Sequence, residues 1–158
     1  MELFNNFSTR EKNLWSELLV DIVIGLYYFP KMFVMMASNT ELSGGAMAEL
    51  ITGTVILAIF MGIIISVFLH TQKKPEQVDE RDHLFDARGS RIAYTVLGLC
   101  VALVIGHIIV NEMLPEVARD RALLNLSPVA IAHLLLLSLY LSSVIKTVMQ
   151  LFFYRRGY

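Results

Sequence analysis

Residues 79–113 read DERDHLFDARGSRIAYTVLGLCVALVIGHIIVNEM. The second part of this stretch, residues 92–113, is almost wholly apolar. It is about as long as the roughly 20 residues that a helix needs to cross the hydrocarbon core of a bilayer. Only Gly89 interrupts the helical pattern of the charged first part, so we expect one helix that begins near Asp79 and projects from the membrane before entering it.

Three further apolar spans occupy residues 14–36, 46–69 and 129–153. The chain has 158 residues, of which 56% are hydrophobic and 17% charged, whereas a soluble domain carries about 25% charged residues. The sequence therefore predicts an all-α integral membrane four-helix bundle that forms a single domain. The net charge of -1 argues against direct binding of nucleic acid through charge.

The basic residues predict the orientation of the four spans, because lysine and arginine near span ends are retained in the cytoplasm. Both termini and the link of residues 70–91 share one side, and the outer link of residues 114–127 carries only Arg119 and Arg121. We expect a multi-pass protein of the cell inner membrane with cytoplasmic termini and an amphipathic helix in the outer link. The cytoplasmic set is Arg10, Lys12, Lys73, Lys74, Arg81, Arg88, Arg91, Arg155 and Arg156.

The charges of the helix extension separate by sign at 100° per residue. The acidic side chains fall on one side and the arginines roughly opposite, so few can pair along their own helix. Their partners must lie on other segments, and we expect a cytoplasmic protein partner here. The alternative is a solvated extension that serves only insertion and solubility. The expected contact residues are Asp79, Arg81, Asp82, Asp86 and Arg88.

A resemblance to a known family rests on the same segment. The run Asp-Glu-Arg-Asp at 79–82, followed by Arg-Gly-Ser-Arg-Ile-Ala-Tyr at 88–94, resembles the DUF2178-like group of small four-span prokaryotic membrane proteins. The resemblance covers residues 79–98 and the four-span layout. It implies no activity, and it implies a cytoplasmic regulatory partner for the segment.

Small residues mark two faces of the third span. Gly98, Ala102 and Gly106 repeat on one face, and Gly89 and Ala93 fall roughly opposite. Helices in lipid associate where small residues let their backbones approach closely. The pattern predicts that this helix is the axle of the bundle or the seam of a homo-oligomer, although such stripes are common in membrane helices generally.

Ionisable residues inside the spans form an inner group. Glu17 and Asp21 lie one turn apart in the first span, and Lys146 lies in the last. Counting 1.5 Å per residue from the cytoplasmic ends puts Asp21 and Lys146 at similar depth. We expect a salt bridge between them, with Glu17 nearer the surface. It is interpreted as a contact that fixes helix packing, with a proton or ion relay as the alternative.

An outer group comprises Glu49, His107, Asn111 and His133. The two histidines are expected at matching depth on antiparallel neighbours, which is the geometry of a haem b or quinone site and equally of a structural polar contact. No catalytic or metal-binding motif occurs. The methionines that end the first span, and Met47 and Met61 in the second, are interpreted as packing residues rather than copper ligands.

The sequence thus favours a non-enzymatic interaction or regulatory subunit without a cofactor, either a homo-oligomer or part of a membrane complex. One alternative is an electron-transfer subunit that binds haem or quinone with His107 and His133. Another is a small channel or transporter that uses Glu17, Asp21, Lys146 and the outer histidines as a polar path.

Overall fold

The computed structural model of the chain describes residues 8–38, 44–70, 79–115 and 126–156. Within them lie α1 (Thr9–Ala37), α2 (Gly44–His70), α3 (Glu80–Met113) and α5 (Pro128–Arg156). All four helices are long and apolar enough to cross a membrane, which confirms the all-α architecture with four spans. The amphipathic helix expected in the outer link falls on residues 116–125, which lie outside the described residues.

Two helices begin where the sequence predicts. Asp79 caps α3, because its carboxylate accepts a hydrogen bond from the Glu80 N–H at 2.7 Å. Ser127 caps α5 by accepting from the Ala130 N–H at 3.1 Å, and Pro128 occupies the first helical position. These side chains satisfy backbone donors that have no partner inside the helix. The third span is therefore one helix with a charged extension of several turns.

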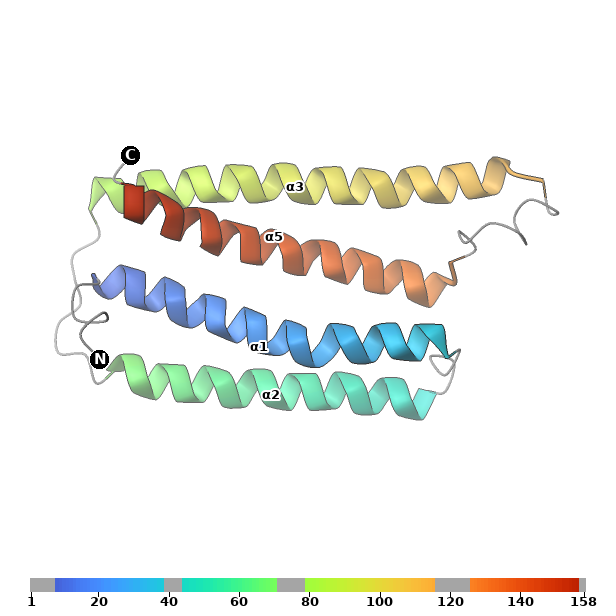
Figure 1. Cartoon of the computed structure of the whole chain (residues 1–158), viewed down its shortest axis with the longest axis horizontal. Helices are drawn as coiled ribbons and strands as arrows, with labels where there is room; N and C mark the ends of the chain where they lie inside the picture. Colours follow the sequence, from blue (N-terminus) through green and yellow to red (C-terminus); the bar gives the residue numbers. More distant parts are fainter. Residues whose placement is uncertain (1–7, 39–43, 71–78, 116–125, 157–158) are drawn as a thin grey trace.

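The helices lie in an open order rather than around a central α3 (Figure 1). α3 packs on α5, α5 packs on α1, and α1 packs on α2. The expectation that the third span is the axle is wrong, since α1 and α5 occupy the middle and α3 an edge. The reason is that only one of its small-residue faces, with Gly89 and Ala93 buried, contacts a neighbour within the described chain.

A glycine allows close approach at each of the three contacts between neighbouring helices. A Cβ added at each of these glycines would collide with a side chain of the neighbouring helix. That neighbouring side chain therefore fills the space that the glycine leaves empty. Such small positions bring helices together in lipid, where apolar burial alone gives no driving force. The three pairs are Gly25 of α1 with Tyr140 of α5, Gly53 of α2 with Tyr27 of α1, and Gly89 of α3 with Gln150 of α5.

The outside of the bundle is apolar over most of its length. On α2, Phe60 is 62% exposed and Val67 64%, and on α3 Leu103 is 66% exposed. A soluble monomer rarely exposes contiguous apolar surface on this scale. A lipid bilayer covers it without cost, so the chain is a multi-pass membrane protein.

Candidate functional site

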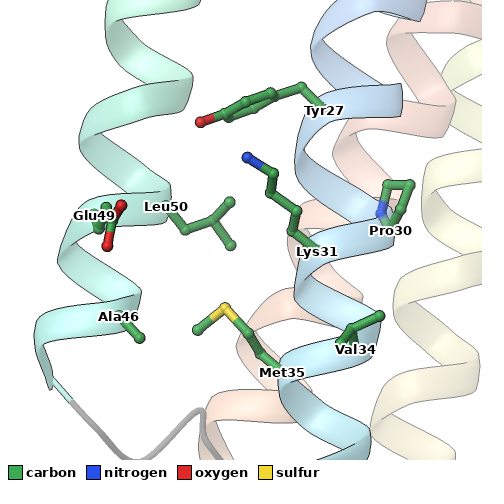
Figure 2. A pocket seen from close by; sticks show the side chains of 8 residues that line it. All are labelled: Tyr27, Pro30, Lys31, Val34, Met35, Ala46, Glu49 and Leu50. Atoms are coloured by element: carbon green, nitrogen blue, oxygen red, sulfur yellow. The ribbon is translucent and has the colours of Figure 1, made fainter.

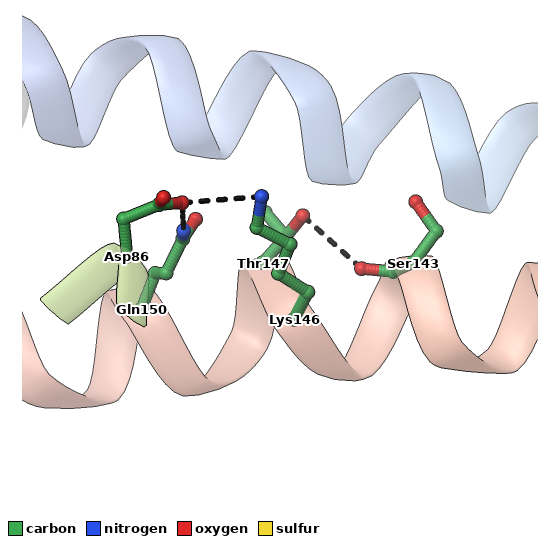
Figure 3. Close-up of polar contacts among 5 residues, drawn as sticks. All are labelled: Asp86, Ser143, Lys146, Thr147 and Gln150. Atoms are coloured by element: carbon green, nitrogen blue, oxygen red, sulfur yellow. Dashed lines mark hydrogen bonds and ion pairs between the residues drawn. The ribbon is translucent and has the colours of Figure 1, made fainter. Parts of the chain in front are cut away.

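A group of polar side chains joins the extension of α3 to the last turns of α5. Asp86 Oδ1 accepts a hydrogen bond from Gln150 Nε2 at 2.6 Å and lies 3.1 Å from Lys146 Nζ (Figure 3). One turn earlier on α3, Asp82 accepts a hydrogen bond from the Tyr154 hydroxyl. These five residues, Asp82, Asp86, Lys146, Gln150 and Tyr154, are named the α3–α5 polar cluster. The cluster holds the charged extension against the bundle.

Two of the five predicted partner-contact residues are therefore used inside the chain. Asp82 and Asp86 bind α5, and Asp79 is the exposed cap of α3. The sequence correctly required partners on other segments, and α5 supplies those of Asp82 and Asp86. Contact of this acidic side with an outside protein stays a prediction. Arg81 and Arg88 remain exposed on the other side of the helix, with Arg88 5.9 Å from the ring centroid of Phe153.

The predicted salt bridge between Asp21 and Lys146 is wrong in its partner. Lys146 binds Asp86 of α3, whereas Asp21 of α1 accepts a hydrogen bond from Ser143 at 3.3 Å. Counting residues fixes depth along each helix but leaves the rotation of α5 undetermined. In the described part of the chain neither Glu17 nor Asp21 forms an ion pair, and Glu17 is exposed.

His133 and His107 do not face each other. His133 is buried on α5, and its Nδ1 lies 2.8 Å from the Tyr28 hydroxyl of α1. Ser142 Oγ of α5 donates a hydrogen bond to the Ala93 carbonyl oxygen of α3, so these two residues lie at the same level. His107 lies 14 residues beyond Ala93, and 14 residues back along the antiparallel α5 from Ser142 lies Pro128. His107 is therefore level with Pro128, about 7 Å from the depth of His133. α5 also leans toward α1 at this end (Figure 1). The haem or quinone hypothesis stays a prediction that this geometry does not support.

The other two residues of the predicted outer site, Asn111 and Glu49, lie on helices other than that of His133. Asn111 is on α3, and its side-chain oxygen is buried without a hydrogen-bond partner. Glu49 lies on α2, which packs mainly on α1, whereas α3, which carries Asn111, packs mainly on α5. Instead Glu49 lines a groove of about 460 Å³ between α1 and α2 (Figure 2).

Sequence reasoning missed several polar residues within the spans. Lys31 lies in the groove between α1 and α2, with its Nζ 3.8 Å from the ring centroid of Tyr27 (Figure 2). Tyr140 donates to the Asp21 carbonyl at 2.9 Å, and Tyr28 binds His133. The sequence does show that these residues need partners, because a lysine or a tyrosine hydroxyl inside an apolar span needs a polar or aromatic neighbour.

No protein-family model, no curated protein and no solved structure matches the chain. The resemblance of residues 79–98 to the DUF2178-like group therefore stays a prediction. What the protein does has to follow from the geometry of its own residues.

Proposed function

We propose that the protein is a non-enzymatic subunit of a membrane complex, and that it assembles by pairing α3 with α3 of a second copy. One observation carries the proposal. A Cβ added at Gly98 or Gly106 would meet no described atom within 4 Å, and Ala102 between them is exposed. These three residues are named the outer stripe of α3.

The outer stripe favours a second helix over lipid as its neighbour. Acyl chains pack as well against leucine as against glycine, and glycine inside a helix costs about 1 kcal/mol relative to alanine. The cost is recovered where another backbone approaches closely. In a two-fold dimer the same surface of each copy forms the interface, so α3 needs no second, different partner surface.

The position of α3 leaves its outer stripe accessible to a second copy. Its buried side is occupied by α5, and it forms one edge of the helix order in Figure 1. Arg88 and Arg91 are exposed on the extension, outside the apolar residues 92–113, and therefore need not enter the apolar interface. Together with Arg81 they form a basic side that suits an acidic segment of a cytoplasmic protein.

The proposed orientation of the protein in the membrane follows from the basic residues at the end of the bundle where α3 begins. The start of α1, the start of α3 and the end of α5 lie together in Figure 1, and Arg10, Arg81 and Arg155 belong to them. Basic residues near span ends favour the cytoplasmic side, so we place this end in the cytoplasm of a cell with the chain in its inner membrane. Reporter fusions at Tyr158 test the assignment, and an active periplasmic reporter contradicts it.

Oligomer mass in nanodiscs tests the pairing. Gly98→Leu fills the outer stripe and is expected to convert dimers to monomers, because the two backbones can no longer approach. Gly62→Leu is the matched control, since Gly62 on the opposite edge helix also has no neighbour within 4 Å of an added Cβ. It should leave the mass unchanged.

A disulfide provides an independent readout. In a Cys100→Ala background, Ala102→Cys is expected to cross-link two copies on mild oxidation, whereas cysteine at Gly62 is not. A monomeric wild type, or equal masses for the two leucine variants, overturns the proposal.

A further inference from the structure

The outer-end portions of α1, α2 and α5 enclose a second pocket whose lining is unusual in its chemistry. It is named the His133 pocket. Four of its six lining residues are methionines, from a total of eight in the chain. Met32 is 1% exposed and belongs to the buried core with Tyr28 and Leu50. The lining residues are Met32, Met35, Met36, Met47, Leu50 and His133.

His133 brings an unmatched nitrogen to this pocket. The side chain is 7% exposed, Nδ1 is bonded to the Tyr28 hydroxyl, and Nε2 has no hydrogen-bond partner among the described residues. The enclosed space is too small to admit a water molecule. A thioether has no hydrogen to donate, so the methionines cannot form a hydrogen bond to a nitrogen lone pair. A buried polar nitrogen without a partner destabilises the fold, because it has lost its hydrogen bond to water and gained none.

The bond to Tyr28 prepares His133 for a metal. When Nδ1–H donates to the tyrosine oxygen, the lone pair of Nε2 is bare on the opposite edge of the ring. Metal-binding histidines use this arrangement, with one nitrogen on the metal and the other held by an outer hydrogen bond. Tyr28 is thus a positioning residue for the imidazole that lines the pocket with the methionines.

The donor set selects the kind of ion. Thioethers and a neutral imidazole are soft, uncharged ligands, and none of the described residues that line the pocket carries a carboxylate. Calcium and magnesium require oxygen ligands, and zinc sites are built from thiolate, imidazole and carboxylate. Soft sulfur ligands select cuprous ion. A monovalent ion also carries the smallest charge into a low-dielectric site.

We propose that His133 and the methionines 32, 35, 36 and 47 form a binding site for Cu(I). Methionine side chains have three rotatable bonds, so the thioethers can move inward to reach bonding distance around an ion. Met35 and Leu50 line both this pocket and the open groove between α1 and α2, where Figure 2 shows Met35 pointing toward α2. Met35 is therefore placed to pass the ion from the groove to the enclosed site. The site does not depend on pairing of α3.

Anaerobic titration of the full chain in detergent with Cu(I), against a chromogenic Cu(I) chelator, tests the site. The wild type should bind a single ion per chain, with X-ray absorption showing sulfur and nitrogen neighbours. Met36→Leu with Met47→Leu keeps side-chain volume and should lower the affinity by at least about tenfold, and Tyr28→Phe by about 10–100-fold. The control pair, Met61→Leu with Met113→Leu, lies outside the pocket and should bind as wild type does.

Three results overturn the proposal. The wild type binds no Cu(I) in competition with the chelator, the two methionine pairs lose affinity equally, or Zn(II) binds as tightly as Cu(I). Each of these leaves the methionines as packing residues and His133 as a purely structural partner of Tyr28.

Discussion

The α3–α5 polar cluster at one end of the bundle and His133 at the other differ in how their polar atoms are paired. Where α3 begins and α5 ends, the carboxylates of Asp82 and Asp86 both have partners on α5. At the opposite end, His133 has a partner for one nitrogen, Tyr28, and none for the other. Matched donors and acceptors hold two helices together, whereas an unmatched buried group carries a penalty that a ligand can remove. The α3–α5 polar cluster is therefore a structural contact, whereas His133 is the group at which we propose that a ligand binds.

The polar side chains at the two ends also differ in their exposure to water. The side chains of Asp86 and Lys146 are 47% and 42% exposed, so water screens their attraction. His133 is 7% exposed. A lost interaction costs more where water cannot replace it. Substitutions at the two ends should consequently differ in size even when each removes a single polar contact.

The largest effect is expected when the α3–α5 contact is broken sterically. A Cβ at Gly89 would lie 2.9 Å from Gln150 Cγ and 3.1 Å from the backbone oxygen of Lys146. Gly89→Leu should lower the free energy of unfolding by about 3 kcal/mol, because the oxygen belongs to the backbone and cannot turn aside. Titration with SDS in mixed micelles measures the change.

The matched control for Gly89→Leu is Gly62→Leu. Gly62 has open space around an added Cβ and lies outside the outer stripe of α3, so the free energy of unfolding should not fall. Equal losses for the two variants would show that helix propensity, and not the contact with α5, explains the first result.

A smaller loss is expected at the other end from Tyr28→Phe. The variant keeps the ring but removes the hydroxyl that satisfies His133 Nδ1, leaving both imidazole nitrogens without a partner. The free energy of unfolding should fall by about 2 kcal/mol. Tyr94→Phe, at a side chain that is 77% exposed, is the control and should change little. An unchanged stability for Tyr28→Phe would contradict the buried hydrogen bond.

The smallest effect is expected from Asp86→Asn. The amide still accepts from Gln150, and only the attraction to Lys146 is lost. Because both charges are nearly half exposed, the loss should stay below about 1 kcal/mol and should shrink as salt is added. Comparing unfolding at low and high salt measures it, with Glu49→Gln as the control. A loss larger than that of Tyr28→Phe would reverse the comparison between the two ends.

Local features of this fold could be predicted from the sequence because they depend on residues a few positions apart. The apolar runs determine the four spans, and the starts of α3 and α5 follow from Asp79 and from Ser127-Pro128. The two faces of α3 also follow from helical periodicity, with Gly89 and Ala93 opposite Gly98. The separation of acidic and basic residues onto two sides of the extension predicted that its acidic side chains need partners on other segments.

Only the tertiary structure decided which partners these are. Lys146 binds Asp86 rather than Asp21, and His133 turns to Tyr28 rather than toward His107. Periodicity gives each helix its faces and depth counting gives the level of each residue, but neither gives the order of the helices or their rotation. In lipid every apolar face is equally well solvated, so the order depends on where a side chain meets a glycine of another helix, as Tyr140 meets Gly25. The fit between a glycine and a side chain depends on two helices in contact, so the sequence of either helix alone does not reveal it.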